Sequence, residues 1–144
     1  MLFSCSLLDN MSSRSGVFKW PIRVYFEDTD SAGIVYYANY LKFMERARSE
    51  WLRSFGLDVS ELAQSEKVLF AVTSIQVKYQ QPARLSDLLQ ASIILKRVGH
   101  ASLDLWQEVT REKDALCSGS LRLACLNVDS LRPCRIPSLI LEKL

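Results

Sequence analysis

One long amphipathic helix, set between a short strand and four longer ones, is the feature that most limits how this chain can fold. From about residue 38 to residue 55, large apolar side chains recur at steps of three and four, which is the spacing of one face of an α-helix. Gly56 follows and provides a natural end for this helix. The apolar residues of the face are Tyr40, Phe43, Met44, Ala47, Trp51 and Phe55. A stripe this bulky requires a sheet to pack against.

The segments on either side of the helix have the patterns of β-strands. In residues 19–28, Ile22, Val24 and Phe26 alternate with residues of the opposite face, which predicts one strand before the helix. Four long segments rich in apolar and β-branched residues follow it, separated by turn-forming residues. They span residues 68–79, 88–98, 101–111 and 115–128. This order predicts an α+β fold, with the helix on one face of a five-stranded, mainly antiparallel sheet.

Two shorter stretches and the termini complete the predicted organisation. Residues 57–66 are expected to contain a short helical turn, and residues 130–144 a closing loop with a final helical turn. Because 144 residues suit one compact domain, we expect a flexible N-terminal arm over residues 1–17 and a single domain over residues 18–144. Met11 is a second candidate start. One helix covers little more than one face of five strands, so the other face and the sheet edges predict a second subunit.

The composition excludes several classes of function. Eighteen Lys and Arg against sixteen Asp and Glu leave a formal net charge of +2 with no dense basic run, so nothing indicates a nucleic-acid-binding protein. No apolar stretch approaches the roughly 20 residues that cross a bilayer. The first ten residues lack the positive start and the cleavage site of a signal peptide. We therefore expect a cytoplasmic protein with no transmembrane segment.

The cysteines and the histidine indicate neither a disulfide framework nor a metal site. The four cysteines form no C-x-x-C pair, and Cys117 and Cys125 are expected to be small buried hydrophobes. His100 is the only histidine, so one chain cannot supply two histidine ligands to a metal. Any Ser-His-Asp or Cys-His site would have to be built around that residue. The chemistry is therefore expected to rest on carboxylates, with no metal and no other cofactor.

The segment EDTDSAGIVYYAN, residues 27–39, is the strongest candidate for a functional site. It gathers Glu27, Asp28 and Asp30 at the junction of the first strand and the helix. The free N–H groups and partial positive charge of a helix N-terminus can polarise a carbonyl, and a desolvated carboxylate gains basicity. Together they would suffice for acyl transfer without histidine. On spacing alone, however, an aspartate before a helix is more often a cap or a turn residue.

A specific motif adds to this interpretation. The pattern D-x-D-x-x-G-x-V-Y-x-x-x-Y runs from Asp28 to Tyr40 within residues 18–56, a region that closely resembles the opening of the YbgC-type acyl-CoA thioesterases. These belong to the 4-hydroxybenzoyl-CoA thioesterase group of the hotdog-fold superfamily. Residues 77–90 and 131–137 also fit this family. The resemblance implies the hotdog fold, a long central helix wrapped by a five-stranded sheet, in agreement with the predicted elements.

The resemblance also implies roles for individual residues. Asp30 matches the family's catalytic carboxylate, which attacks the thioester carbonyl or activates a water molecule. Gly33 would let the chain approach the substrate, and the backbone N–H near Tyr37 would polarise the thioester carbonyl. Asp28 is expected to bond the turn. Many YbgC-type sequences carry histidine where this chain has Tyr37, although tyrosine is what the 4-hydroxybenzoyl-CoA branch shows there.

The leading hypothesis is a thioesterase that hydrolyses an acyl or aryl thioester of coenzyme A, or of an acyl carrier protein, to a free acid and a thiol. Coenzyme A takes part as a piece of the substrate. By resemblance, the chain should form dimers whose sheets join edge to edge, paired into tetramers, with the site at the subunit interface. Three alternatives stay open: a hotdog hydratase acting on enoyl thioesters, a non-catalytic acyl-thioester-binding or scaffolding protein linked to the cell envelope, and a structural dimer whose Asp28 and Asp30 only cap the helix.

Overall fold

The structure is a computed structural model that describes residues 16–144 of the chain. The predicted N-terminal arm lies outside the described residues, except for its last two positions. The strands are β1 (Val17–Arg23), β2 (Val68–Tyr79), β3 (Leu88–Val98), β4 (Ser102–Arg111) and β5 (Asp114–Asn127). The helices are α1 (Asn39–Ser54), α2 (Val59–Ser65) and α3 (Ser138–Leu141), with a 3-10 turn, η1 (Phe26–Asp28), between β1 and α1.

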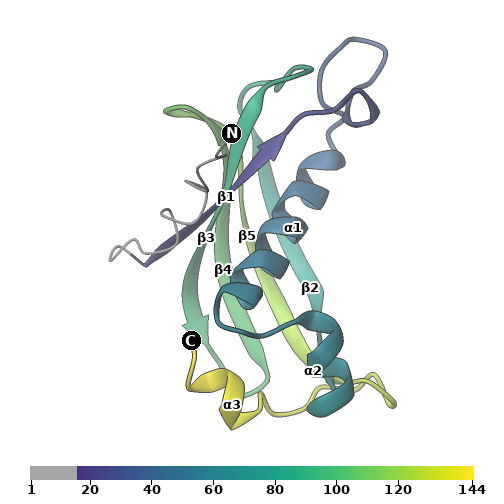
Figure 1. Cartoon of the computed structure of the whole chain (residues 1–144), viewed down its shortest axis with the longest axis vertical. Coiled ribbons are helices and arrows are strands. Elements are labelled where there is room, and N and C mark those ends of the chain that lie inside the picture. Colours follow the sequence, from purple (N-terminus) through teal and green to yellow (C-terminus); the bar gives the residue numbers. More distant parts are fainter. Residues whose placement is uncertain (1–15) are drawn as a thin grey trace, which may run out of the picture.

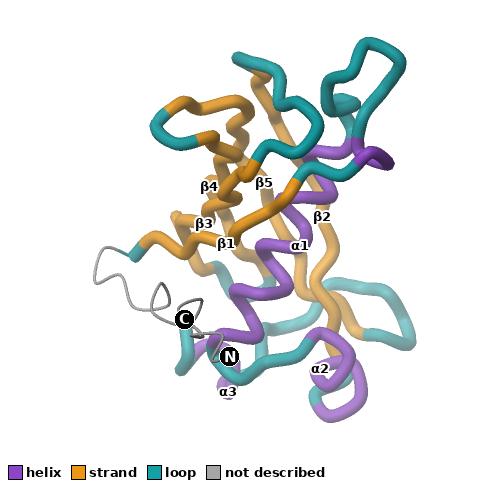
Figure 2. Tube along the Cα trace, turned by 45° about the horizontal axis from the view of Figure 1, so that its top comes forward, coloured by secondary structure: helices purple, strands orange, loops and turns teal. Residues whose placement is uncertain are grey.

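The five strands form one antiparallel sheet with the order β1-β3-β4-β5-β2, so β1 and β2 are its edges. α1 lies along one face of the sheet, and α2 and α3 lie near the end of the molecule where α1 terminates (Figure 1, Figure 2). This confirms the predicted α+β arrangement. Pro21 lacks a backbone N–H, and it is accommodated because β1 is an edge strand with only one neighbouring strand to bond.

The apolar face of α1 forms the centre of the core, as its spacing predicts. Phe55, at the end of this face, is only partly buried and packs edge-on against Trp51. Gly56 ends the helix with φ at +77°, a conformation that favours glycine, and the Leu57 N–H donates to the Leu52 carbonyl at 3.1 Å. The buried residues of the face are Tyr40, Phe43, Met44, Ala47, Trp51 and Leu52.

The first strand is shorter than its alternating pattern predicts. β1 ends at Arg23, and the backbone of Val24 bonds instead to the loop before β3, where its N–H donates to the Asp87 carbonyl and its carbonyl accepts from the Ser86 N–H. The chain then turns into η1. Phe26, predicted to share one face of the strand with Ile22 and Val24, is 82% exposed there, whereas Ile22 and Val24 are buried. That part of the prediction is wrong, because the turn removes Phe26 from the sheet.

One surface of the sheet beside α1 is left uncovered. Val72, Ile75 and Tyr79 of β2 pair with core residues of β5, so they share the helix-facing side of the sheet. They nevertheless stay exposed, Val72 to 44%, because β2 is an edge strand that α1 does not reach across. We call these three residues the β2 stripe.

None of the helices described within residues 16–144 has the length and apolar content needed to span a membrane.

Candidate active site

Asp28 organises the loop that joins β1 to α1. Its side chain is 3% exposed and accepts two hydrogen bonds, from the Tyr25 N–H at 2.8 Å and from the Asn39 side-chain amide at 3.0 Å. Its backbone carbonyl accepts a third bond, from the Tyr36 N–H at 2.9 Å. The expectation that Asp28 bonds the turn is confirmed. It fixes the start of α1 relative to the end of β1.

Asp30 lies at the tip of the same loop, in a different environment. One carboxylate oxygen accepts from the Ala32 N–H at 2.8 Å, the backbone carbonyl accepts from the Gly33 N–H at 3.0 Å, and the backbone N–H donates to the Ile34 carbonyl at 2.9 Å. The residue is exposed in the single chain. The expectation of a desolvated carboxylate is therefore wrong for one chain by itself, because no apolar side chain among residues 16–144 covers the loop tip.

Gly33 is required by the backbone of this loop. Its φ of +74° lies in the left-handed region, which any side chain would strain. A Cβ atom at this position would meet no atom of residues 16–144 within 4 Å. Conformation, and not crowding by the chain's own atoms, therefore explains glycine here, and the space beside it is open.

The N-terminus of α1 presents unpaired backbone donors. The helix begins at Asn39 after Ala38, whose side chain makes no capping hydrogen bond. Within the described range 16–144, no hydrogen bond uses the backbone N–H of Tyr37 or of Ala38. These groups lie at the positive end of the helix dipole, so they can bind an oxygen that carries negative charge.

A cleft opens beside this helix end. It has a volume of about 260 Å³ and runs between the loop before α1 and the end of β2. The residues that line it are Ile34, Val35, Tyr37, Tyr40, Tyr79, Gln80, Gln81 and Pro82. Asp30 and Gly33 do not line it. Asp30 is connected to the lining through its backbone, because its N–H donates to the carbonyl of Ile34, one of the lining residues.

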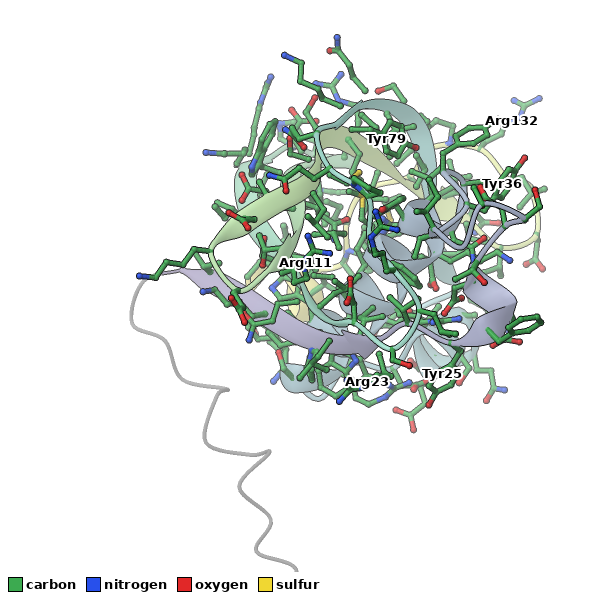
Figure 3. The ribbon with its side chains drawn as sticks, turned by 90° about the horizontal axis from the view of Figure 1, so that it is seen from above. Arg23, Tyr25, Tyr36, Tyr79, Arg111 and Arg132 are labelled. Atoms are coloured by element: carbon green, nitrogen blue, oxygen red, sulfur yellow. The ribbon has the colours of Figure 1, made fainter. Side chains whose placement is uncertain are left out.

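Tyrosines form one wall of the cleft. The ring of Tyr79 packs edge-on against those of Tyr37 and Tyr40, with centroids 6.2 and 5.6 Å apart, and its hydroxyl donates to the Tyr37 carbonyl at 2.9 Å. The Tyr40 hydroxyl accepts from the Ala83 N–H. Burial raises the pKa values of Tyr40 and Tyr79, so both stay protonated near neutral pH. Figure 3 looks down on this end of the molecule and shows Tyr79 and Tyr36 on the same side of it.

Other groups able to do chemistry lie elsewhere. His100, the only histidine of the chain, is exposed in the turn between β3 and β4, and its carbonyl accepts from the Ile136 N–H of the C-terminal segment. It does not line the cleft. Residues 16–144 contain no group of three or more His, Cys, Asp or Glu side chains arranged to hold a metal ion.

The sequence reasoning missed two polar positions that hold the site in place. Asn39 donates a hydrogen bond to Asp28. The sequence feature that could have revealed this role is an amide side chain directly before the apolar stripe of the helix. Gln107 of β4 is fully buried; its amide donates to the Met44 carbonyl of α1, and its oxygen accepts from Arg48. Desolvation lowers the pKa of Arg48. Gln107 and Arg48 are 59 residues apart, so no local pattern could have paired them.

Comparison with known proteins decides the family. A family model described as the thioesterase superfamily matches residues 32–118, which include Gly33, Tyr37 and the tyrosines of the cleft wall. The chain belongs to this superfamily. It is 35% identical over 128 residues to the acyl-CoA thioester hydrolase YbgC of Escherichia coli O6:H1, which covers 88% of this chain and 95% of that protein. It is 34% identical to the acyl-CoA thioesterase YbgC of Haemophilus influenzae, over 83% of this chain and 88% of that one.

Solved structures of other thioesterases share the fold. A probable thioesterase from Bartonella henselae superimposes with a TM-score of 0.80 at 32% identity, covering 84% of this chain and 99% of the other. The gentisyl-coenzyme A thioesterase BH1999 has a TM-score of 0.78 at 29% identity, over 85% and 98% of the two chains. The hotdog fold implied by the motif is thus confirmed. As a member of the thioesterase superfamily, the chain is a thioester hydrolase.

Proposed function

We propose that this thioesterase hydrolyses acyl or aryl thioesters of coenzyme A, with Asp30 as nucleophile or general base. The observation that carries the proposal is the meeting of three features at one end of α1. These are unpaired backbone donors at Tyr37 and Ala38, an open cleft lined by tyrosines, and the adjoining loop of Asp30, whose backbone N–H donates to the lining residue Ile34. The relatives named as acyl-CoA thioesterases support coenzyme A as the carrier.

The proposed chemistry uses these residues and a water molecule. The Tyr37 N–H donates to the thioester carbonyl oxygen and stabilises the negative charge that forms there in the transition state. Asp30 either takes a proton from the attacking water or attacks the carbonyl carbon itself, which gives a mixed anhydride that water then hydrolyses. In both routes the C–S bond breaks, coenzyme A leaves as the thiol, and the acyl group becomes a carboxylic acid.

The exposure of Asp30 supports a site that is completed by a second copy of the chain. A carboxylate in open water is a weak base, and covering the loop tip with another subunit would desolvate it. The β2 stripe and the free backbone edge of β2 are the surfaces suited to such a contact. We therefore propose a dimer whose sheets join at their β2 edges, with two dimers forming a tetramer.

Because this chain has Tyr37 where many relatives have histidine, the site has no imidazole at that position. Because the donor to the thioester is a backbone N–H, replacing histidine by tyrosine keeps the donor and removes only the imidazole. The tyrosine wall suits aryl and fatty acyl groups alike. We also propose the cytoplasm as the site of action, a compartment in which cysteines are kept reduced.

The test is thiol release from a panel of short, long and aromatic acyl-CoAs. Asp30→Asn should lower kcat by about 10²-fold or more while leaving the fold and acyl-CoA binding intact. Asp129→Asn makes the same chemical change at an exposed position in the loop after β5 and should leave turnover unchanged. Turnover of Asp30→Asn at the level of the unmodified chain would end the assignment. Tight binding of acyl-CoA by the unmodified chain without any release would favour the non-catalytic binding protein instead.

A further inference from the structure

Two cysteines lie in contact where the C-terminal segment joins the sheet. The Sγ atoms of Cys125, in β5, and Cys134, in the segment after β5, are 3.8 Å apart. The Cys134 N–H donates to the Cys125 carbonyl at 2.9 Å, and the neighbouring residues Leu126 and Pro133 form an antiparallel bridge. The two cysteines therefore face each other across an antiparallel pair. Such pairs hold their Cα atoms about 5.5 Å apart, within the range that a disulfide spans.

The two thiols differ in their access to solvent. Cys125 is completely buried, and burial together with the neighbouring Cys134 thiol raises its pKa to about 12. Cys134 is partly exposed. A dissolved oxidant therefore reaches Cys134 first, and Cys125 stands beside it, already in van der Waals contact. Cys117 offers a contrast within the same chain, because it is buried and has no bond to another cysteine among the described residues.

We propose that Cys125 and Cys134 are a redox-active dithiol that peroxide converts to an intramolecular disulfide. The Cys134 sulfur attacks hydrogen peroxide, which breaks the O–O bond, releases water and leaves a sulfenic acid on Cys134. The Cys125 thiol then attacks that sulfur, forms the S–S bond and releases the second water. Two thiols lose two electrons and two protons, and one peroxide becomes two waters. A small thiol reductant reverses the step by exchange.

The disulfide would fix the C-terminal segment to the sheet. At present the segment is held by backbone bonds, including that from the Ile136 N–H to the His100 carbonyl, and by the buried side chains of Ile136 and Ile140. The new bond adds a covalent link beside them. Phe70 pairs with Cys125, nine residues along β2 from Tyr79, so the pair lies about 30 Å from the cleft. The expected effect is therefore on the C-terminal segment and its anchoring, not on the thioester site.

Peptide mapping tests the proposal directly. Trypsin cuts poorly before Pro133, so residues 123–135 stay in one peptide that carries both cysteines. After the full chain is treated with a small excess of hydrogen peroxide and free thiols are alkylated, this peptide should lack both alkyl groups and weigh two hydrogen atoms less than the dithiol. Treatment with dithiothreitol before alkylation should restore two alkyl groups. A peptide with both thiols still alkylated, or with Cys134 overoxidised and Cys125 alkylated, would overturn the proposal.

Single variants test the order of the two steps. In Cys125→Ser the sulfenic acid has no neighbouring thiol, so dimedone should label Cys134. In Cys134→Ser, dimedone should leave Cys125 unlabelled, because that thiol is buried. Cys117→Ala is the matched control and should form the disulfide in the same yield as the unmodified chain. Equal labelling of Cys125 and Cys134 in the two variants would contradict the assigned order.

Discussion

Two aspartates only two residues apart show how strongly local environment separates a buried, bonded carboxylate from an exposed one. Asp28 is buried and accepts hydrogen bonds from Tyr25 and Asn39, so its carboxylate is bonded within the protein and is closed to solvent. Asp30 accepts one bond, from the adjacent loop, and is exposed. An exposed carboxylate with unused acceptor sites is open to a substrate, whereas a buried carboxylate is not.

Replacing Asp28 tests this division of roles. Asp28→Ala leaves the buried amide of Asn39 without its acceptor, so the free energy of unfolding should fall by about 1–3 kcal/mol. Urea unfolding of Asp28→Ala, Asn39→Ala and the double variant measures it. Because both single changes break the same bond, the double variant should lose less than the sum of the two. Additive losses would show that the bond between Asp28 and Asn39 contributes nothing to stability. Asp30→Asn is the control and should change the free energy of unfolding by less than about 0.5 kcal/mol.

The sequence predicted the loop that carries the candidate residues better than it predicted their environment. The motif from Asp28 to Tyr40 located the loop, and the bonding role of Asp28 is confirmed. The same motif could not show that Asp30 is exposed in one chain, because exposure depends on which surfaces other elements cover. Tyr79 was also missed as a partner of Tyr37, since 42 residues separate them in the chain and only the folded sheet brings them together.

At the scale of elements, α2 depends on a single capping residue. Asp58 precedes the helix, and its carboxylate accepts from the Ser60 N–H at 2.9 Å, from the Ser60 hydroxyl and from Arg53. The Ser60 hydroxyl, then Arg53, then the Ser60 N–H lower the pKa of Asp58 to about 2 from its ordinary value of 3.8. The ionised cap is thus preferred in the folded state.

This pKa shift predicts a dependence of stability on pH. A carboxyl whose pKa is lowered by folding stabilises the protein fully above pH 3.8, and that contribution is lost as the pH falls through about 2. Asp58→Ala should therefore lower the free energy of unfolding at neutral pH, and the difference from the unmodified chain should shrink toward pH 2. Asp58→Asn should lose less, because asparagine caps nearly as well. Urea unfolding at several pH values measures the difference, and one that stays constant to pH 2 would contradict the assignment.

Most elements followed from periodicity, and the exception has a clear cause. β2 and β3 coincide with the predicted segments, and α1 starts within one residue of its predicted start. The end of β1 was predicted too late, since the alternation continues through Phe26 while the backbone of Val24 bonds to the loop before β3. That competing partner lies more than 60 residues away, so alternation alone could not reveal it.

At the scale of the whole molecule, the order of the strands was beyond the sequence pattern. Five alternating segments are compatible with many arrangements, and the placement of β2 at an edge beside β5 is a result of the fold. This placement leaves the β2 stripe exposed next to an unpaired backbone edge, a surface that isolated proteins normally protect. Asp30 is exposed as well, and a second copy of the chain that covered both surfaces would account for both.

The proposed dimer can be broken without altering the core. Val72→Lys places a charge in the β2 stripe. In the single chain this position is exposed, so the lysine stays in water, but an apolar contact with a second copy would bury its charge. Light scattering should shift from a multiple of 16.4 kDa toward that single-chain mass, and thiol release should fall toward the level of Asp30→Asn because the carboxylate then stays in water. Leu139→Lys, an equally exposed leucine in α3, is the control and should change neither quantity. A Val72→Lys chain that is folded, of single-chain mass and fully active would show that one copy suffices, and Asp30 would then have to act while exposed.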